Sequence, residues 1–205
     1  MSSQHRGTAT SGTLCAMTQT PGTERYSLRQ KITLMVNRYE IIAANPDGSF
    51  GEMLGLAEQK RFAFKEQVTF YSDDSKTRPV FGFKARKAID LNAGYDITDE
   101  SGQQIGFFRK DFGASLLRST FHLEGPGYAG VGRERSQLVA LLRRFTEISF
   151  LPFHFDFTEP NGTVLMSSER QATLRDKYTV HVPDERVDFR VAAAVAVGLD
   201  ALMQR

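Results

Sequence analysis

The stretch Arg186-Val-Asp-Phe-Arg-Val-Ala-Ala-Ala-Val-Ala-Val-Gly-Leu-Asp-Ala-Leu-Met-Gln-Arg205 decides the fold. No residue from Val191 to Leu199 is polar, so the apolar residues surround the whole cylinder of a helix. A helix of this kind is buried on all sides. Arg190 and Asp200 bracket only nine uncharged residues, whereas a membrane span needs about 20. The rest of the chain must therefore enclose this helix.

We expect the helix to run from Arg186 to Gln204, which gives a length of about 28 Å at 1.5 Å per residue. Asp184, which follows Pro183, is the predicted N-cap. Acidic residues near this end favour the positive pole of the helix dipole.

The remaining chain has the composition of β-strands. Residues 80–86 alternate, with Phe81, Phe83 and Ala85 on one face and the polar Lys84 and Arg86 on the other. Turn residues, among them an Asn-Gly pair, separate several such segments and predict hairpins. The predicted strands are 28–35, 38–44, 52–60, 68–71, 80–86, 95–98, 104–109, 116–123, 153–158, 164–171 and 178–182.

A weak internal repeat supports one architecture for these strands. Tyr39, Tyr95 and Phe155 lie 56 and 60 residues apart, and each precedes a hairpin with a glycine-containing turn. Repeated hairpins are typical of a closed antiparallel barrel, which has no exposed edge. The predicted fold is therefore mainly β, with a closed antiparallel barrel around the hydrophobic C-terminal helix.

The segment between residues 125 and 150 interrupts the strand pattern. Residues 125–132 are predicted to form a loop. Leu138, Leu141, Leu142 and Phe145 follow at helical spacing and predict an amphipathic helix over residues 133–146, with its charged residues solvated. The charged residues concerned are Arg133, Glu134, Arg143 and Arg144.

Length and composition indicate one domain. The chain has 205 residues, a net charge of +2 and a single cysteine, Cys15. We expect a flexible tail over residues 1–26 and one domain over residues 27–205. The absence of a possible intrachain disulfide and of an apolar signal segment predicts a cytoplasmic protein. Met17 is an alternative start of translation.

The chain from about Leu28 onward resembles the tubby C-terminal-like superfamily, especially its LURP-one-related (LOR) branch, close to the phospholipid scramblases. The segments that carry the resemblance are 28–31, 39–41 with 47–48, 80–86, 95–106 and 187–202. The resemblance implies a β-barrel of about twelve strands around a central hydrophobic helix, with the amphipathic helix as an addition. The calcium-binding segment and the palmitoylated cysteine cluster of scramblases are not found in this sequence.

The resemblance also directs attention to basic residues. In tubby proteins, a basic pair on outward positions of a strand holds inositol phosphates, and the nearest counterparts here are Lys84 and Arg86. Residues 60–87 carry eight basic and three acidic residues, a local charge of +5. We therefore predict a headgroup-binding set on one outer face, against the alternative of a solvated surface. The set is Lys84, Arg86, Lys87, Arg109 and Lys110.

Other patterns point to ordinary structure. The sequence G-x-G-x-x-G at residues 125–130 lacks the βαβ context of a dinucleotide site. His122, His154 and His181 lack metal-ligand spacing. Residues 73–74 and the Asn-Gly-Thr sequence at 161–163 are predicted turns. No catalytic residue, metal or cofactor is predicted.

Peripheral binding of anionic phospholipid or phosphoinositide headgroups by a non-catalytic domain is the first function that these observations predict. The alternative is a structural or protein-interaction scaffold whose partner docks on the helix at 133–146. Scramblase-like lipid handling or another enzyme activity is less favoured, because no acid–base or metal cluster is visible. Nucleic-acid binding is not expected, because aromatic residues do not interleave with the basic ones.

Overall fold

A computed structural model describes residues 25–32, 36–45, 47, 49–60, 67–86, 94–111, 119–136, 154–171 and 177–203. These residues form twelve strands and one helix, α2 (Phe189–Met203). The strands are β1 (Arg25–Ile32), β2 (Val36–Ala44), β3 (Phe50–Lys60), β4 (Gln67–Tyr71), β5 (Pro79–Ala85), β6 (Tyr95–Asp99), β7 (Gln104–Asp111), β8 (Thr120–Gly125), β9 (Tyr128–Glu134), β10 (His154–Thr158), β11 (Val164–Gln171) and β12 (Lys177–His181).

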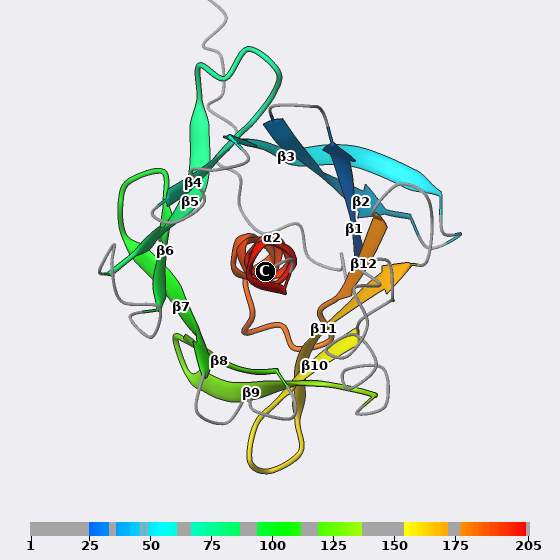
Figure 1. Cartoon of the computed structure of the whole chain (residues 1–205), viewed down its shortest axis with the longest axis vertical. Coiled ribbons are helices and arrows are strands. Elements are labelled where there is room, and N and C mark those ends of the chain that lie inside the picture. Colours follow the sequence, from blue (N-terminus) through cyan, green and yellow to red (C-terminus); the bar gives the residue numbers. More distant parts are fainter. Residues whose placement is uncertain are drawn as a thin grey trace, which may run out of the picture.

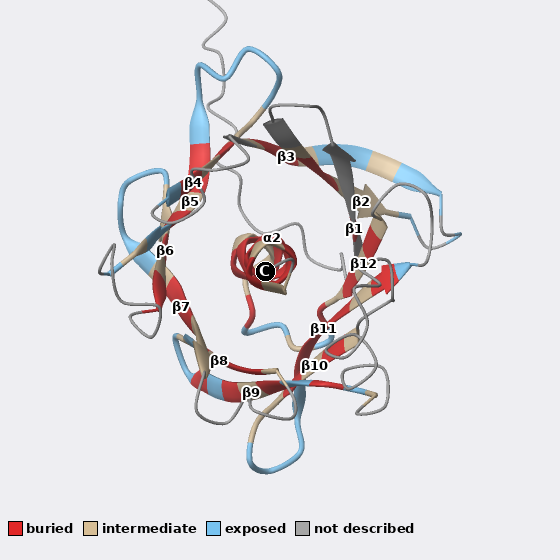
Figure 2. Cartoon of the chain, in the orientation of Figure 1, coloured by how far each residue is buried: buried red, intermediate tan, exposed pale blue. Residues whose placement is uncertain are grey.

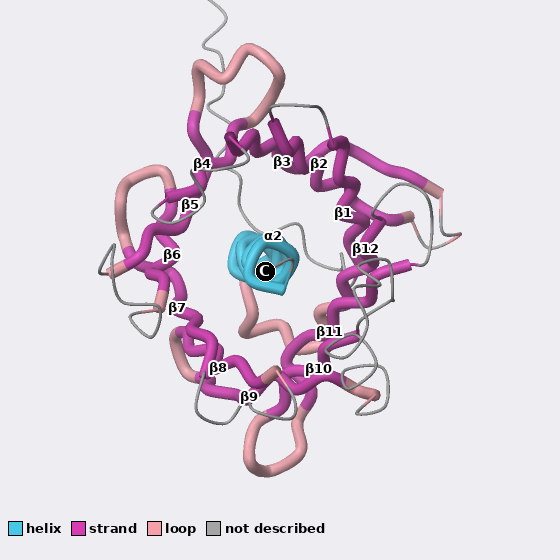
Figure 3. The backbone as a smooth tube through the Cα atoms, viewed as in Figure 1, coloured by secondary structure: helices cyan, strands magenta, loops and turns pink. Residues whose placement is uncertain are grey.

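All strand pairs are antiparallel, and each strand pairs with its neighbours in the chain. The last strand also pairs with the first, with Arg25 opposite His181, so the strand order is that of a closed barrel. Helix α2 lies inside the ring of strands (Figures 1 and 3). The predicted mainly β fold, with one antiparallel sheet and a buried C-terminal helix, is confirmed.

The strands alternate between an inner and an outer face. In β5, Phe81 and Phe83 are buried, whereas the intervening Gly82 and the following Lys84 face outward, as the pattern predicted. Aromatic rings fill much of the space between the sheet and α2, and Phe70 stacks on Phe81 with ring centroids 4.2 Å apart. Figure 2 shows that α2 and much of the ring of strands are buried, whereas the turns between strands carry many of the exposed residues.

Helix α2 fits inside the barrel because its side chains are small. A side chain at Gly198 would come within 2.5 Å of the Phe108 ring, and one at Gly106 of β7 within 2.9 Å of Val191. The absence of these two side chains lets the helix approach β7 closely. Ala and Val supply most of the remaining helix surface, and residues 191–200 are all buried.

The helix begins later than predicted. Asp188 is the N-cap: its carboxylate accepts a bond of 2.8 Å from the Arg190 backbone N–H, and its carbonyl one of 3.1 Å from Ala192. The predicted cap, Asp184, instead closes a turn before the helix, where it accepts bonds from the backbone of Arg186 and Val187. The two acids have the same spacing to the next arginine, which is why the sequence did not distinguish them.

One carboxylate lies deep inside the barrel. Asp200 of α2 has no exposed surface. It accepts a hydrogen bond of 2.9 Å from the Tyr39 hydroxyl and a second from the Tyr178 hydroxyl. Buried carboxylates require such partners, since an isolated buried charge is very costly. The helix is thus joined to β2 and β12 by directional bonds as well as by packing.

Strand β9 is a correction to the sequence analysis. Residues 125–132 were predicted as a loop, but they form the turn and most of the second strand of the β8–β9 hairpin. Its glycines face inward, where a side chain at Gly130 would meet Leu165 at 2.6 Å and one at Gly132 would meet Phe157 at 2.3 Å. These glycines therefore make room for large neighbours rather than marking a loop.

The predicted amphipathic helix falls mainly outside the described residues, which omit 137–150. Its expected first residues, Arg133 and Glu134, belong to β9 instead. Glu134 is 1% exposed and not solvated as predicted, because strand alternation turns it toward the barrel interior. The predicted tail at 1–26 is described only from Arg25, where β1 begins.

Candidate functional site

The predicted basic residues do not all lie on the same face of the sheet. Lys84 is exposed on the outer face of β5. It forms no ion pair or side-chain hydrogen bond within the described part of the chain. Arg109 of β7 is half-buried, and it too has no such partner among the described residues. Lys87 lies outside the described residues. Lys84 and Arg109 are thus two cations that can accept an anion without breaking an existing ion pair.

Arg86 is held in place by two contacts. Its guanidinium makes bonds to the Asp96 carboxylate, with Nη2–Oδ1 at 2.8 Å and Nε–Oδ2 at 3.1 Å. It also lies 4.0 Å from the centre of the Phe107 ring, a cation–π distance. Bonding to Asp96 raises the pKa of Arg86 above its ordinary value. Half of the side chain remains exposed, so Arg86 is fixed but still reachable.

Lys110 does not join the others. It follows Arg109 directly in β7, and consecutive side chains of a strand point to opposite faces. Its Nζ donates a bond of 3.2 Å to the Leu202 carbonyl of α2. A cation at the C-terminal end of a helix is favourable for the helix dipole. The prediction that all five basic residues share one outer face is therefore wrong for Lys110.

A hollow lies on the outer face beside Lys84. It has a volume of about 280 Å³ and a lining from β4, β5 and β6. Gly82 is part of that lining, and a Cβ there would approach the Val68 carbonyl oxygen at 2.8 Å. The residues around it are Gln67, Phe83, Lys84, Ala85, Asp96 and Thr98.

The same backbone arrangement recurs around β9–β11. Arg86 donates its N–H to the Gly94 carbonyl at 3.1 Å, and Arg135 donates to His154 at 2.8 Å. Asp156 holds Arg135 as Asp96 holds Arg86, with Nη2–Oδ1 at 2.7 Å. Both following hairpins have a register shift at the same place, after Ile97 in one and Phe157 in the other. The predicted repeat therefore corresponds to a real structural repeat.

The repeat places different charges at equivalent positions. Arg109 of β7 corresponds to Glu169 of β11. Glu169 pairs with His154, and Arg109 lies opposite Gly94, which is the equivalent of His154. Glu169 accepts a bond of 2.9 Å from Arg135. The set Lys84, Arg86, Asp96 and Arg109 carries three positive charges and one negative, or +2. The set Arg133, Arg135, Asp156 and Glu169 carries two of each, or zero.

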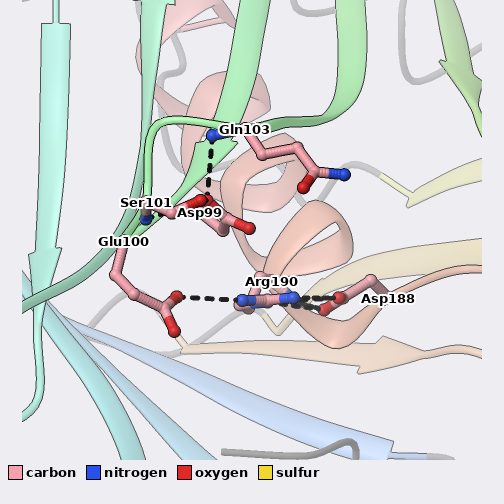
Figure 4. A network of polar contacts seen from close by, with 6 residues as sticks. All are labelled: Asp99, Glu100, Ser101, Gln103, Asp188 and Arg190. Carbon is pink, nitrogen blue, oxygen red and sulfur yellow. Dashed lines mark hydrogen bonds and ion pairs between the residues drawn. The ribbon is translucent and has the colours of Figure 1, made fainter.

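Arg186, which precedes α2, and Arg190, in the first turn of α2, form a clasp that was not predicted from the sequence. Arg190 forms ion pairs with Asp188 and, at 3.2 Å, with Glu100 in the β6–β7 turn (Figure 4). In that turn, the Asp99 carboxylate accepts hydrogen bonds from the backbone N–H groups of Ser101 and Gln103. Arg186 bonds Glu159 of the β10–β11 turn at 2.9 Å. The signal in the sequence was the repeated spacing of an acid two residues before each arginine.

Arg186 also donates a bond of 2.7 Å to the Gly127 carbonyl in the β8–β9 turn. Together, the two arginines connect three adjacent hairpin turns to the start of the helix. These residues are engaged with one another, so the clasp serves to fix the helix rather than to receive a ligand.

Within the part of the chain that the structure describes, the remaining candidates form no larger cluster. His122 lies 3.1 Å from Asp111 across β7 and β8. Within the described ranges, no three His, Cys, Asp or Glu side chains are grouped to hold a metal ion. No helix among the described residues has the length and hydropathy to cross a bilayer.

Comparisons with known proteins give one family. A family model described as LURP-one-related matches residues 55–200, which is most of the chain. No curated protein matches. A porin-like protein from Bacteroides uniformis is similar at 10% identity over 78% of this chain and 96% of that one, with a TM-score of 0.20. That score is too low to support an inference about fold or function.

Proposed function

Because the chain belongs to the LURP-one-related family, we propose that it is a non-catalytic module that binds anionic phospholipid headgroups at the membrane periphery, on the cytoplasmic side. The binding face is the outer side of β5–β7, with Lys84 and Arg109 as the primary contacts and Arg86 between them. Lys87 and Lys110, which were in the predicted set, are not part of this proposal.

The observation that carries the proposal is the charge of this face. The charges of Lys84, Arg86, Asp96 and Arg109 sum to +2, and to +1 when Asp111 at the end of β7 is included, while the equivalent residues on β9–β11, with Gln171 in place of Asp111, sum to zero. Lys84 and Arg109 have no carboxylate partner in the described part of the chain. Cations without partners bind phosphate without first losing an ion pair, and each contributes about 1 kcal/mol near an anionic surface.

Position also favours Arg86 as part of the face. Gly94 lies between Arg86 and Arg109 in the antiparallel register, and it contributes no side chain to the face there. Phe107 fixes Arg86 by stacking. A fixed guanidinium loses less conformational freedom when it binds a headgroup.

The test is co-sedimentation of the purified protein with neutral and anionic vesicles at low and physiological salt. We expect binding to anionic vesicles alone, weakened by salt. The Lys84→Ala/Arg109→Ala double variant should bind at least tenfold more weakly, because it loses two surface charges at about 1 kcal/mol each.

A matched control is Arg78→Ala/Arg133→Ala, which removes the same charge from exposed positions elsewhere. It should bind within a factor of three of the wild type. Equal losses in both double variants would show that net charge alone attracts the protein, and absence of anionic binding would reject the proposal.

A further inference from the structure

The hollow beside Lys84 offers a specific combination of groups. Lys84 and Asp96 lie directly opposite one another in the β5–β6 register and both line it. Thr98 adds a hydroxyl, and Gln67 adds an amide whose nitrogen is directed at Thr69 at 3.4 Å. The described residues therefore give the hollow one cation, one carboxylate and neutral hydrogen-bonding groups.

Lys84 is the single cation among the described residues that line the hollow. Arg86 is next to it but has its guanidinium on Asp96 and Phe107. Arg109 lies two strands away and does not line the hollow. A group with several phosphate charges would thus have one cation for all of them, and it would face the Asp96 carboxylate as well.

Asp96 retains accepting capacity. Within the described part of the chain, its Oδ2 accepts one bond, of 3.1 Å, from Arg86 Nε, whereas a carboxylate oxygen can accept more than one. The Gln67 amide oxygen is a second acceptor on the opposite side of Lys84. A hydroxyl or ammonium group beside the phosphate would find a partner here.

We infer that the hollow takes a single phosphodiester headgroup with a hydroxyl or amine, such as that of phosphatidylglycerol, and not an inositol polyphosphate. Lys84 and the Thr98 hydroxyl donate hydrogen bonds to the phosphodiester. Asp96 or Gln67 accepts a hydrogen bond from the hydroxyl or amine of the headgroup. This inference rests on the proposed function and specifies the lipid that the same face selects.

The test compares vesicles that contain either phosphatidylglycerol or a bisphosphorylated phosphoinositide, matched for total surface charge. The wild type should bind the phosphatidylglycerol vesicles about threefold more tightly than the phosphoinositide vesicles. Lys84→Ala should lower the affinity for phosphatidylglycerol vesicles about fivefold. Thr98→Val, which keeps the shape and removes the hydroxyl, should lower it about threefold.

Thr158→Val is the matched control, because Thr158 holds the position of Thr98 in the β10–β11 hairpin. It should leave binding unchanged. Soluble glycerophosphoglycerol should compete with the vesicles, while inorganic phosphate at the same concentration should not, which separates a lipid headgroup from a free phosphate.

The outcomes separate the two claims. Equal or tighter binding to the phosphoinositide vesicles, or equal losses from Thr98→Val and Thr158→Val, overturns the inference and leaves the proposed function standing. Stronger competition by a single-stranded oligonucleotide than by glycerophosphoglycerol also overturns it. Absence of binding to every anionic vesicle overturns the proposed function, and the inference falls with it.

Discussion

The β5–β7 and β9–β11 regions share a backbone and differ in charge and side-chain volume. In both, an arginine directly after the first strand holds an aspartate of the next strand. In β9–β11 that arginine is also bound by Glu169, whereas in β5–β7 the equivalent residue is Arg109. The shared ion pair is therefore part of the architecture, and the difference at one position decides whether the face carries excess charge.

The interiors differ in a complementary way. Phe83 of β5 pairs with Ile97, whereas the equivalent Gly132 of β9 pairs with Phe157. The phenylalanine of the pair is on the first strand, β5, in one region and on the second strand, β10, in the other. Such exchanges preserve the total volume of a core, which is what close packing requires.

The largest effect is expected from disturbing this exchange. Gly132→Ala places a Cβ 2.3 Å from the Phe157 ring and should lower the free energy of unfolding by about 2–3 kcal/mol through overpacking. Phe157→Ile, which copies Ile97, should recover part of the loss in the double variant, as chemical denaturation will measure. Strictly additive effects would show that the two residues do not share one volume. Ala129→Ser, at an exposed site on the same strand, is the control.

The next effect concerns charge. Arg109→Glu gives β7 the residue that β11 has and changes the face by two charges. Binding to anionic vesicles should weaken by about 2 kcal/mol, or about thirtyfold. The opposite change, Glu169→Arg, should create a second cationic face and strengthen binding. If both variants bind like the wild type, the comparison between the two faces has no functional meaning.

A smaller effect is expected from the shared ion pair. Asp96→Asn removes the carboxylate that Arg86 bonds, while Asp156→Asn leaves Arg135 bonded to the Glu169 carboxylate. The pairs are one-third to one-half exposed, so we expect a loss of about 0.5–1 kcal/mol for Asp96→Asn and less for Asp156→Asn. Thermal unfolding in low salt will rank the two, and the reverse order would contradict the assignment.

The smallest effect is expected on the stability of the fold at acidic pH. A hydrogen bond from Ser101 lowers the pKa of Asp99, and one from Arg186 lowers the pKa of Glu159 at the equivalent turn position. A carboxylate with a depressed pKa stabilises the fold above its ordinary pKa, and that contribution is lost as the pH falls through the folded-state pKa.

Melting temperatures between pH 7 and about pH 3 test this. The Glu159→Gln variant should lose less stability than the wild type below its ordinary pKa of 4.5, and the difference should shrink in high salt, because Arg186 is the partner. Asp99→Asn should also reduce the fall in melting temperature at acidic pH, but with little dependence on salt, since hydroxyl and backbone groups donate the hydrogen bonds to Asp99. The same salt response in both would contradict this distinction.

The sequence predicted the outward and inward faces of β5 and the burial of α2, because alternation and uniform hydrophobicity are local signals. It failed at β9, where Gly130 and Gly132 look like loop residues. Their role depends on Leu165 and Phe157, which lie on other strands. Local patterns do not contain that information.

The basic set shows the same limit. Lys84 and Arg86 were placed correctly on the outer face, since they alternate with phenylalanines. Lys110 was misplaced because it was grouped with Arg109 by proximity in the chain, although the side chains of adjacent strand residues point to opposite faces of the sheet. The partner of Arg86, Asp96, was within reach of sequence reasoning: it follows the repeated aromatic position at Tyr95.

The position of α2 after all twelve strands has a consequence for folding. The barrel closes by pairing β1 with β12, for example Arg25 with His181, and its interior is filled by a segment that follows both. Non-local pairing of this kind slows folding, because the entropy of closing a long loop is lost before contacts compensate for it. During synthesis, the aromatic residues of the strands stay uncovered until α2 has left the ribosome, because α2 is made after the strands that surround it.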